Sequence, residues 1–219
     1  MQNYTKLVAV LFAVFTTAGS TAQIYSGFAD ASITLKADST TRSALISNLL
    51  ADRVGDMSPI IGTAAWAENN NKLQCRSLLA FDYGILPKLL KPEQIVEAQL
   101  ILRPVEFSTV ESINGVPSPK FSIQRIVEPW EDSLINWLTQ PASEVTDETV
   151  KQLDVTRKRK TIKIDVTEIV KNMFRFGNNG FMIRNEDSLE TAVFISQWFA
   201  SAKNEDEKLR PQLVIKWSR

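Results

Sequence analysis

The 219-residue chain contains no histidine and one cysteine, and its 25 lysines and arginines balance 25 aspartates and glutamates. Without histidine there is no Ser-His-Asp or Cys-His catalytic site and no histidine-ligated metal. One cysteine forms neither an internal disulfide nor a multi-cysteine zinc or iron–sulfur site. A formal charge of zero supplies no field that would steer the protein onto nucleic acid or an anionic membrane. The composition leaves carboxylate chemistry, oxygen-ligated calcium, or binding without chemistry.

The first residues, 1–22, have the pattern of a secretory signal peptide. Lys6 precedes an apolar run from Leu7 to Phe15, and small residues then lead to Ala22. A basic start, a short apolar core and small residues before the cleavage site define such a peptide, and the run is too short for a membrane span of about 20 residues. We therefore expect one domain over residues 23–219, secreted to the periplasm or the cell exterior.

Downstream of this segment, short stretches that alternate polar and apolar residues, and a short apolar run at residues 77–81, predict β-strands. Period-2 segments bounded by Pro, Gly, Asn and Asp favour an antiparallel sheet with one face on the core. Residues 42–58 and 84–94 stay ambiguous. The expected strands, in chain order, are Ser32–Leu35, Ser77–Phe81, Ile95–Leu102, Phe121–Val127, Ile162–Val166, Gly180–Ile183, Ala192–Phe199 and Gln212–Trp217.

One segment changes to helical spacing. Ile169, Val170 and Met173 recur as on one face of a helix, Thr167 is suited to cap its start, and Gly177 is suited to end it. We expect a helix of about two turns directly after the Ile164–Val166 strand, where it would close one edge or end of the sheet structure. Asp82 and Asp165 lie at strand ends, where aspartate stabilises turns and helix starts. The expected class is all-β with one short helix.

The order of these segments resembles the DNRLRE domain (disaggregatase-related) family. The pieces that carry the resemblance are residues 76–82, the Trp130–Trp137 element with Pro141, the junction at residues 164–170, and residues 210–214. Together the resemblance spans about residues 28–217. It implies a jelly-roll-like antiparallel β-sandwich of the secreted, carbohydrate-binding-module-like kind.

Aromatic side chains are the first candidates for a carbohydrate site, because a flat ring can pack on the apolar C–H face of a sugar. Trp66, Tyr83 and Trp198 fall outside or beside the family-like motifs. Trp198 stands where the resembling family usually has an acidic residue. Alternation places Phe194 and Trp198 on one face of a strand, so a core position for Phe194 would bury Trp198 as well. For Trp66 the sequence favours neither a core position nor a surface position.

The one dense charge run is Arg157, Lys158, Arg159 and Lys160. As a binding site it would form a basic patch for an acidic polysaccharide such as a uronate polymer. As a structural feature it would be a solvated strand edge that discourages aggregation. Nucleic acid is disfavoured as a partner, since no aromatic residues interleave with the charges.

Acidic residues also flank the family-like tryptophans. Glu128, Glu131 and Asp132 lie beside Trp130, and glycoside hydrolysis needs two carboxylates at a defined separation. We expect these three to be loop charges, and Trp130 and Trp137 to be core anchors. No calcium-loop spacing is present, so no cofactor is expected, although a structural Ca²⁺ stays open.

The sequence therefore predicts a secreted non-catalytic module that binds a polysaccharide or another cell-surface component. The alternative is a structural or adhesion module that binds protein or the cell envelope, and a polysaccharide hydrolase or lyase ranks third. Cys75 is expected to be a small buried residue rather than a reactive thiol. The oligomeric state is left open.

Overall fold

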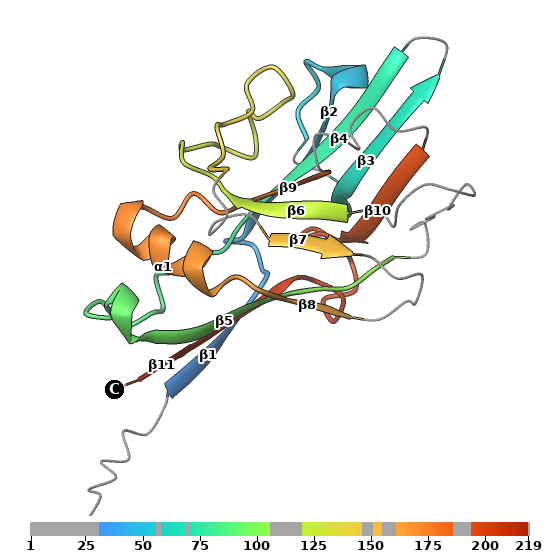
Figure 1. Cartoon of the computed structure of the whole chain (residues 1–219). Helices are drawn as coiled ribbons and strands as arrows, with labels where there is room; N and C mark the ends of the chain where they lie inside the picture. Colours follow the sequence, from blue (N-terminus) through green and yellow to red (C-terminus); the bar gives the residue numbers. More distant parts are fainter. Residues whose placement is uncertain are drawn as a thin grey trace, which may run out of the picture.

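Two sheets face each other in the structure, and every strand pair in them is antiparallel (Figure 1). This computed structural model describes residues 31–55, 58–68, 71–105, 120–145, 151–154, 161–185 and 194–218. The expected signal segment and the basic run at residues 157–160 lie outside the described residues. Within them, the expectation of an all-β sandwich with a short helix is confirmed.

The smaller sheet brings the start and the end of the described chain together. Its strands, in spatial order, are β1 (Ala31–Lys36), β11 (Gln212–Trp217), β5 (Ile95–Leu102) and β8 (Ile162–Asp165). The inward-facing positions of β11 and β5, such as Ile215 and Leu100, are fully buried. This alternation of buried and accessible positions is the pattern by which the sequence predicted both strands.

The larger sheet carries the middle of the chain. Its main order is β10 (Phe194–Ala200), β3 (Ile60–Glu68), β4 (Asn71–Ala80), β9 (Phe181–Asn185), β6 (Lys120–Arg125) and β7 (Lys151–Asp154), and β2 (Arg42–Ser47) pairs with β4 outside this order. Two short 3₁₀ turns, η1 (Asn48–Leu50) and η2 (Pro92–Gln94), lie in the connections.

The larger sheet is apolar on both faces. Leu79 of β4 joins the main core between the sheets, whereas Leu78 and Ala80 face the opposite way and pack with Trp130 and Ile135. The second core forms because the loop over residues 126–145, yellow in Figure 1, covers the outer face. A strand that is covered on both faces shows a continuous apolar run instead of alternation, which accounts for residues 77–81.

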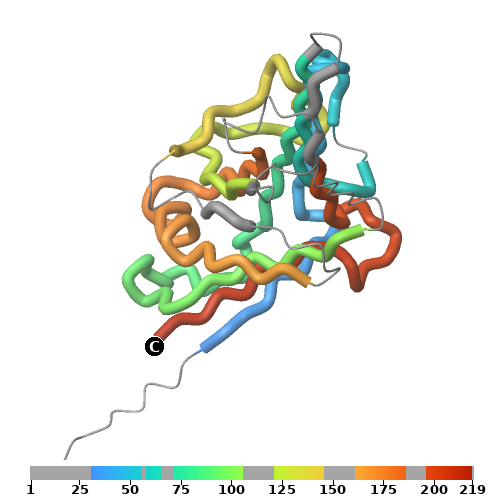
Figure 2. Tube along the Cα trace, turned by 45° about the vertical axis from the view of Figure 1, so that its right-hand side comes forward, coloured from blue at the N-terminus to red at the C-terminus, as the bar shows by residue number. Residues whose placement is uncertain are grey.

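The helix α1 (Thr167–Phe176) closes one end of the space between the sheets. It buries Ile169, Val170 and Met173 in the main core. Figure 2 shows α1 in orange beside the green loop that follows β4, on the side opposite the red segment after β10. The expected position of the helix is therefore confirmed, and its end at Gly177 is confirmed by a Gly177 N–H bond to the Met173 carbonyl (2.9 Å).

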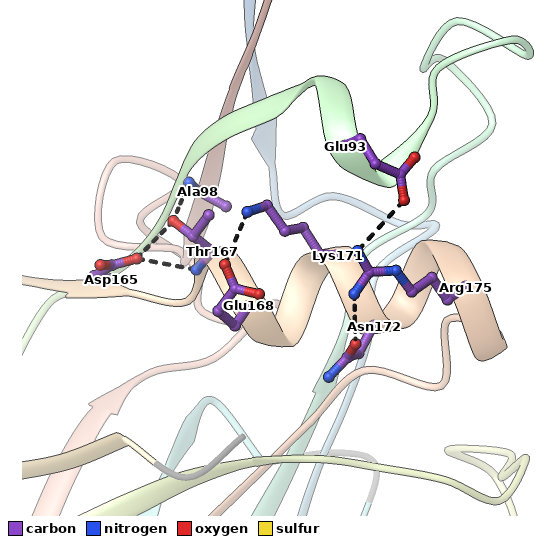
Figure 3. A network of polar contacts seen from close by, with 8 residues as sticks. All are labelled: Glu93, Ala98, Asp165, Thr167, Glu168, Lys171, Asn172 and Arg175. Carbon is purple, nitrogen blue, oxygen red and sulfur yellow. Dashed lines mark hydrogen bonds and ion pairs between the residues drawn. The ribbon is translucent and has the colours of Figure 1, made fainter. Parts of the chain in front are cut away.

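The start of α1 differs from the expectation (Figure 3). Thr167 is the first helical residue rather than the cap, and the capping position belongs to Val166, which has no polar side chain. Asp165 compensates, because its Oδ1 accepts the Thr167 N–H (3.0 Å) and the Thr167 hydroxyl (2.6 Å). The Thr167 Oγ1 in turn accepts the Ala98 N–H (2.9 Å), which ties the helix to β5. The expected role of Asp165 at a helix start is confirmed.

The larger sheet branches at Gly62. β4 pairs with β3 along residues 71–75 and with β9 along residues 77–79, so β3 leaves β4 where β9 takes over. At that point the Ser77 hydroxyl accepts the Gly62 N–H (2.7 Å) and donates to the Gly62 carbonyl (2.8 Å). A Cβ at residue 62 would lie 1.8 Å from the Gln197 carbonyl oxygen, so only glycine fits the branch.

Several strands go beyond what the sequence indicated. β5 and β11 have the expected bounds, but β4 is longer than residues 77–81, and β2, β3 and β7 were not expected. β3 contains the small residues Thr63, Ala64 and Ala65, which give little alternation to detect. All three are buried in the sheet.

Candidate functional site

Trp198 lies on a partly exposed face of the larger sheet. Its side chain is half-buried and packs, together with Leu45, against the three buried residues Ala64, Leu73 and Cys75. The register partner of Trp198 on β3 is Gly62. The Trp198 side chain is therefore not fully buried in a core, and part of its surface is accessible for contact with a ligand.

The register brings Trp66 to the same pair of strands. Trp66 is the partner of Phe194 on β10 and of Leu73 on β4. Positions 66 and 198 thus lie four residues apart along the β3–β10 pair, since the partner of Trp198 is Gly62. The two tryptophans proposed from the sequence as carbohydrate-binding residues belong to one part of the larger sheet.

A pocket adjoins this face. It has a volume of about 380 Å³ and lies between β2, the first half of β4 and the segment that follows η1; its lining residues are Leu45, Ser47, Leu50, Arg53, Val54, Gly55, Ser58, Pro59 and Cys75. Leu45 and Cys75 belong both to the pocket and to the cluster that carries Trp198. The exposed side chain of Arg53 provides a positive charge at its wall.

The far wall of the pocket is fixed to the end of β10. The Ser201 hydroxyl donates to the Ser58 carbonyl (2.7 Å), and the Ser201 N–H donates to the Pro59 carbonyl (3.0 Å). The Ser58 hydroxyl donates a hydrogen bond to the Ile60 carbonyl (2.7 Å). These bonds hold the wall and the strand that carries Trp198 in one arrangement.

Cys75 is buried and is one of the residues that line this pocket. Burial raises the pKa of its thiol, and a hydrogen bond from the Ser47 side chain offsets only part of that effect. A raised pKa keeps the sulfur protonated and therefore weakly nucleophilic. The expectation of a small buried residue is confirmed.

Tyr83 lies elsewhere in the molecule, against α1. Its ring stacks on Phe174 with a centroid distance of 5.4 Å, and its hydroxyl contacts the Met173 sulfur at 3.3 Å. Burial raises the pKa of Tyr83. The structure therefore does not bring Tyr83 together with Trp198, and Arg157, Lys158, Arg159 and Lys160 lie outside the described residues.

Trp130 is a core residue, as expected. It is buried in the outer core, its indole N–H donates to the Asn179 carbonyl (2.8 Å), and the Arg42 guanidinium lies over its ring at 5.0 Å. Arg42 also donates to the Trp130 carbonyl. These contacts anchor the 126–145 loop to β2 and to the segment before β9.

Trp137 is only half-buried, so its expected core position is reached in part. The Arg76 guanidinium lies 4.7 Å from the centre of its ring and donates to the Gln140 Oε1 (2.8 Å). The Gln140 amide nitrogen donates back to the Trp137 carbonyl (2.9 Å). The sequence did not indicate this cluster, although both Arg76 and Trp137 stand in the family-like motifs.

Two of the acidic residues beside Trp130 make structural contacts from the loop over residues 126–145. Glu128 accepts the Ala142 N–H (2.7 Å), and Asp132 lies 3.6 Å from the Lys203 ammonium group. In the part of the chain that the structure describes, no group of three or more Cys, Asp or Glu side chains could hold a metal ion. Among the same residues, no helix has the length and apolar character needed to cross a membrane.

The fold and this face define a β-sandwich with a half-buried tryptophan next to a pocket, an arrangement suited to holding a ligand. Residues 62–217 match carbohydrate-binding module family 96, and the chain belongs to that family. No curated protein matches the chain. Membership supports the carbohydrate-binding character implied by the resemblance found in the sequence, and families of this kind are in general non-catalytic; the DNRLRE name stays a prediction.

Proposed function

We propose that the protein is a secreted, non-catalytic module that binds an acidic polysaccharide on the Trp198 face and in the adjoining pocket. The observation that carries this proposal is the half-buried Trp198 sharing a packing cluster with a pocket of about 380 Å³ that presents Arg53. The signal-peptide pattern and the lack of histidine in the chain support secretion and binding without catalysis.

Each part of the face has a task in this proposal. Trp198 offers a flat apolar surface to the C–H side of a sugar ring, as tryptophan does in ligand sites with a few convergent polar groups. The Arg53 guanidinium can bind a carboxylate with two parallel hydrogen bonds. A uronic acid carries both an apolar C–H side and a carboxylate. The basic run at residues 157–160 is a further candidate from the sequence for binding the carboxylates of such a polymer.

Binding to a panel of neutral and uronate polymers tests the proposal. We expect retention of the wild-type protein by at least one uronate polymer and weaker retention of Trp198→Ala and Arg53→Ala. Phe176→Ala and Lys88→Ala are matched controls, because both residues are exposed and neither lines the pocket. If no polymer retains the wild-type protein, carbohydrate binding is refuted; release of new reducing ends or unsaturated products would refute the non-catalytic role.

One observation favours the alternative of an adhesion module. Leu49, Leu134 and Leu138 are exposed on two loops, which are joined by backbone bonds from Leu138 N–H to the Ala51 carbonyl (3.4 Å) and from Gly55 N–H to the carbonyl of residue 135 (3.1 Å). Neighbouring exposed leucines are typical of a protein contact. Binding to cell-envelope fragments that is lost after protease treatment, and in a Leu134→Ser/Leu138→Ser variant, would favour this function.

A further inference from the structure

Backbone hydrogen bonds join the two sheets where β5 ends. Residues 103–105 continue the course of β5 along β10, the edge strand of the larger sheet, and form an isolated antiparallel bridge with it. The Val105 N–H donates to the Trp198 carbonyl (3.1 Å), and the Ala200 N–H donates to the Arg103 carbonyl (3.0 Å). The strand that carries Trp198 therefore has the larger sheet on one side and the end of β5 on the other.

This joint places Arg103 on the same side as Trp198. Phe199 belongs to the main core, so its bridge partner Pro104 also faces inward, and the neighbouring positions face outward. Trp198 and its partner Val105 share the outward side, and Arg103 lies on that side two residues from Val105. One strand spacing and two residues along the strand put the Cα atoms of Trp198 and Arg103 about 8 Å apart.

The Arg103 side chain is held in place without being neutralised. It is half-buried, and its Nη1 donates to the Arg210 carbonyl (2.9 Å). The nearby carboxylate of Glu207 pairs with the Arg210 guanidinium (3.2 Å). Among the described residues, no carboxylate pairs with Arg103. A guanidinium has five N–H donors, so the bond to Arg210 leaves donors for the carboxylate of a ligand.

The outer face of the smaller sheet continues the positive charge next to Arg103. Ile101 alternates with core residues of β5 and therefore faces outward, two residues before Arg103. The register places one row across the sheet at this level: Lys36, Gln212, Ile101 and Lys163. Both lysines are exposed, and neither pairs with a carboxylate of the described residues. The end of this face that adjoins β10 is therefore basic.

The acidic residues on the same face are already engaged. Glu97 accepts from the Lys216 ammonium group (2.5 Å) and from the Gln99 amide (2.6 Å). Asp165 accepts the two hydrogen bonds from Thr167 at the start of α1. Both carboxylates lie further from the joint than the row that contains the two lysines. They therefore leave the positive charge of that row uncompensated.

Trp198 is flanked by guanidinium groups. From β10 the larger sheet continues through β3 and β4 to β2, beside which the pocket with Arg53 lies, whereas Arg103 lies across the joint. We propose that Arg103 is a second carboxylate-binding residue of the Trp198 face, and that the polysaccharide crosses Trp198 from the pocket onto the basic end of the smaller sheet. The inference rests on the proposed function, since it extends the same site. The ligand is then a polymer that carries carboxylates repeatedly along its chain.

Calorimetric titration with a uronate oligosaccharide tests the role of Arg103. Arg103→Gln should bind about tenfold more weakly, the loss expected for one charge-assisted hydrogen bond. Its melting temperature should stay unchanged, because glutamine keeps an N–H donor for the Arg210 carbonyl. Arg103→Lys should bind with intermediate affinity, since it keeps the charge but loses the paired donors. The matched control is Arg175→Gln, an exposed arginine on α1 that pairs with Glu93 (3.4 Å) and should not affect binding.

A second variant does not depend on the bond between Arg103 and Arg210. Lys36 and Lys163 are exposed, so the double variant Lys36→Gln/Lys163→Gln should fold as the wild type does. Each substitution should weaken binding by about two- to fivefold, the range for an exposed ion pair. The affinity of the double variant should also depend less on added salt than that of the wild type.

The outcomes separate this inference from the proposed function. If Trp198→Ala weakens binding but Arg103→Gln binds as tightly as the wild type, the inference is wrong and the proposed function stands. If Arg103→Gln has a lower melting temperature, the double lysine variant decides: an affinity and salt dependence equal to those of the wild type would also refute the inference. If the wild-type protein binds no uronate ligand, both fail.

Discussion

Replacing Ser77 with alanine should destabilise the protein strongly for the loss of one oxygen atom. Ser77 is fully buried, and its hydroxyl satisfies both the N–H and the carbonyl of Gly62 where β3 leaves β4. Each buried backbone group left unpaired costs about 1–3 kcal/mol. Because the two groups belong to one residue and can relax together, we expect a total loss of about 2–4 kcal/mol.

Urea denaturation followed by tryptophan fluorescence measures this loss as a shift of the midpoint at constant slope. The matched control is Ser43→Ala, because Ser43 is equally buried but its hydroxyl has no hydrogen-bond partner among the described residues. The control should change the free energy of unfolding by less than about 0.5 kcal/mol or stabilise the protein. If the two variants lost the same free energy of unfolding, Ser77 would not be the residue that satisfies the Gly62 backbone groups at the branch.

Three further predictions concern Gly62, Asp38 and Cys75. Gly62→Ala should lower the melting temperature more than Ser77→Ala, because its Cβ would meet the Gln197 backbone oxygen at 1.8 Å and backbone cannot swing away; a smaller drop in a thermal melt would contradict the close approach. Hydrogen bonds from Thr40 lower the pKa of Asp38 below its usual 3.8, so the ionised carboxylate stabilises the folded state above that pH, and this stabilisation is lost on further acidification. Asp38→Asn should therefore flatten the acid side of a curve of unfolding free energy against pH. An unchanged curve would show that the bonds are not formed in solution. Burial raises the pKa of Cys75, so an aromatic disulfide reagent at pH 8 should label it slowly in the native protein and completely in urea; fast native labelling would show that the thiol is accessible.

The parts of the fold that the sequence predicted are those with one buried face. β11 alternates cleanly, β5 alternates over Ala98–Leu100, and α1 carries its apolar residues at helical spacing, so these elements could be located from periodicity. β3 escaped detection because Thr63, Ala64 and Ala65 are small, and because its course depends on the branch at Gly62. A branch is a tertiary feature and has no period in the sequence.

The candidate site was predictable only at the level of residue type. Trp198 was identified as an aromatic candidate, but its half-buried state depends on the cluster of Ala64, Leu73 and Cys75 brought together from two other strands. Tyr83 was an equally reasonable candidate until Phe174 of α1 covered its ring. The pocket at Arg53 and the position of Arg103 beside Trp198 arise from strand registers that no single segment encodes.

Calorimetric titration with a uronate oligosaccharide answers most directly whether this module holds an acidic polysaccharide on the Trp198 face. The wild-type protein and Phe176→Ala should bind with equal affinity, which should weaken as salt is added. Trp198→Ala and Arg53→Ala should each bind about tenfold more weakly, the loss expected for one stacking contact or one charge-assisted hydrogen bond. Absence of binding by the wild-type protein, or affinities of Trp198→Ala and Arg53→Ala equal to that of Phe176→Ala, would contradict the proposed function.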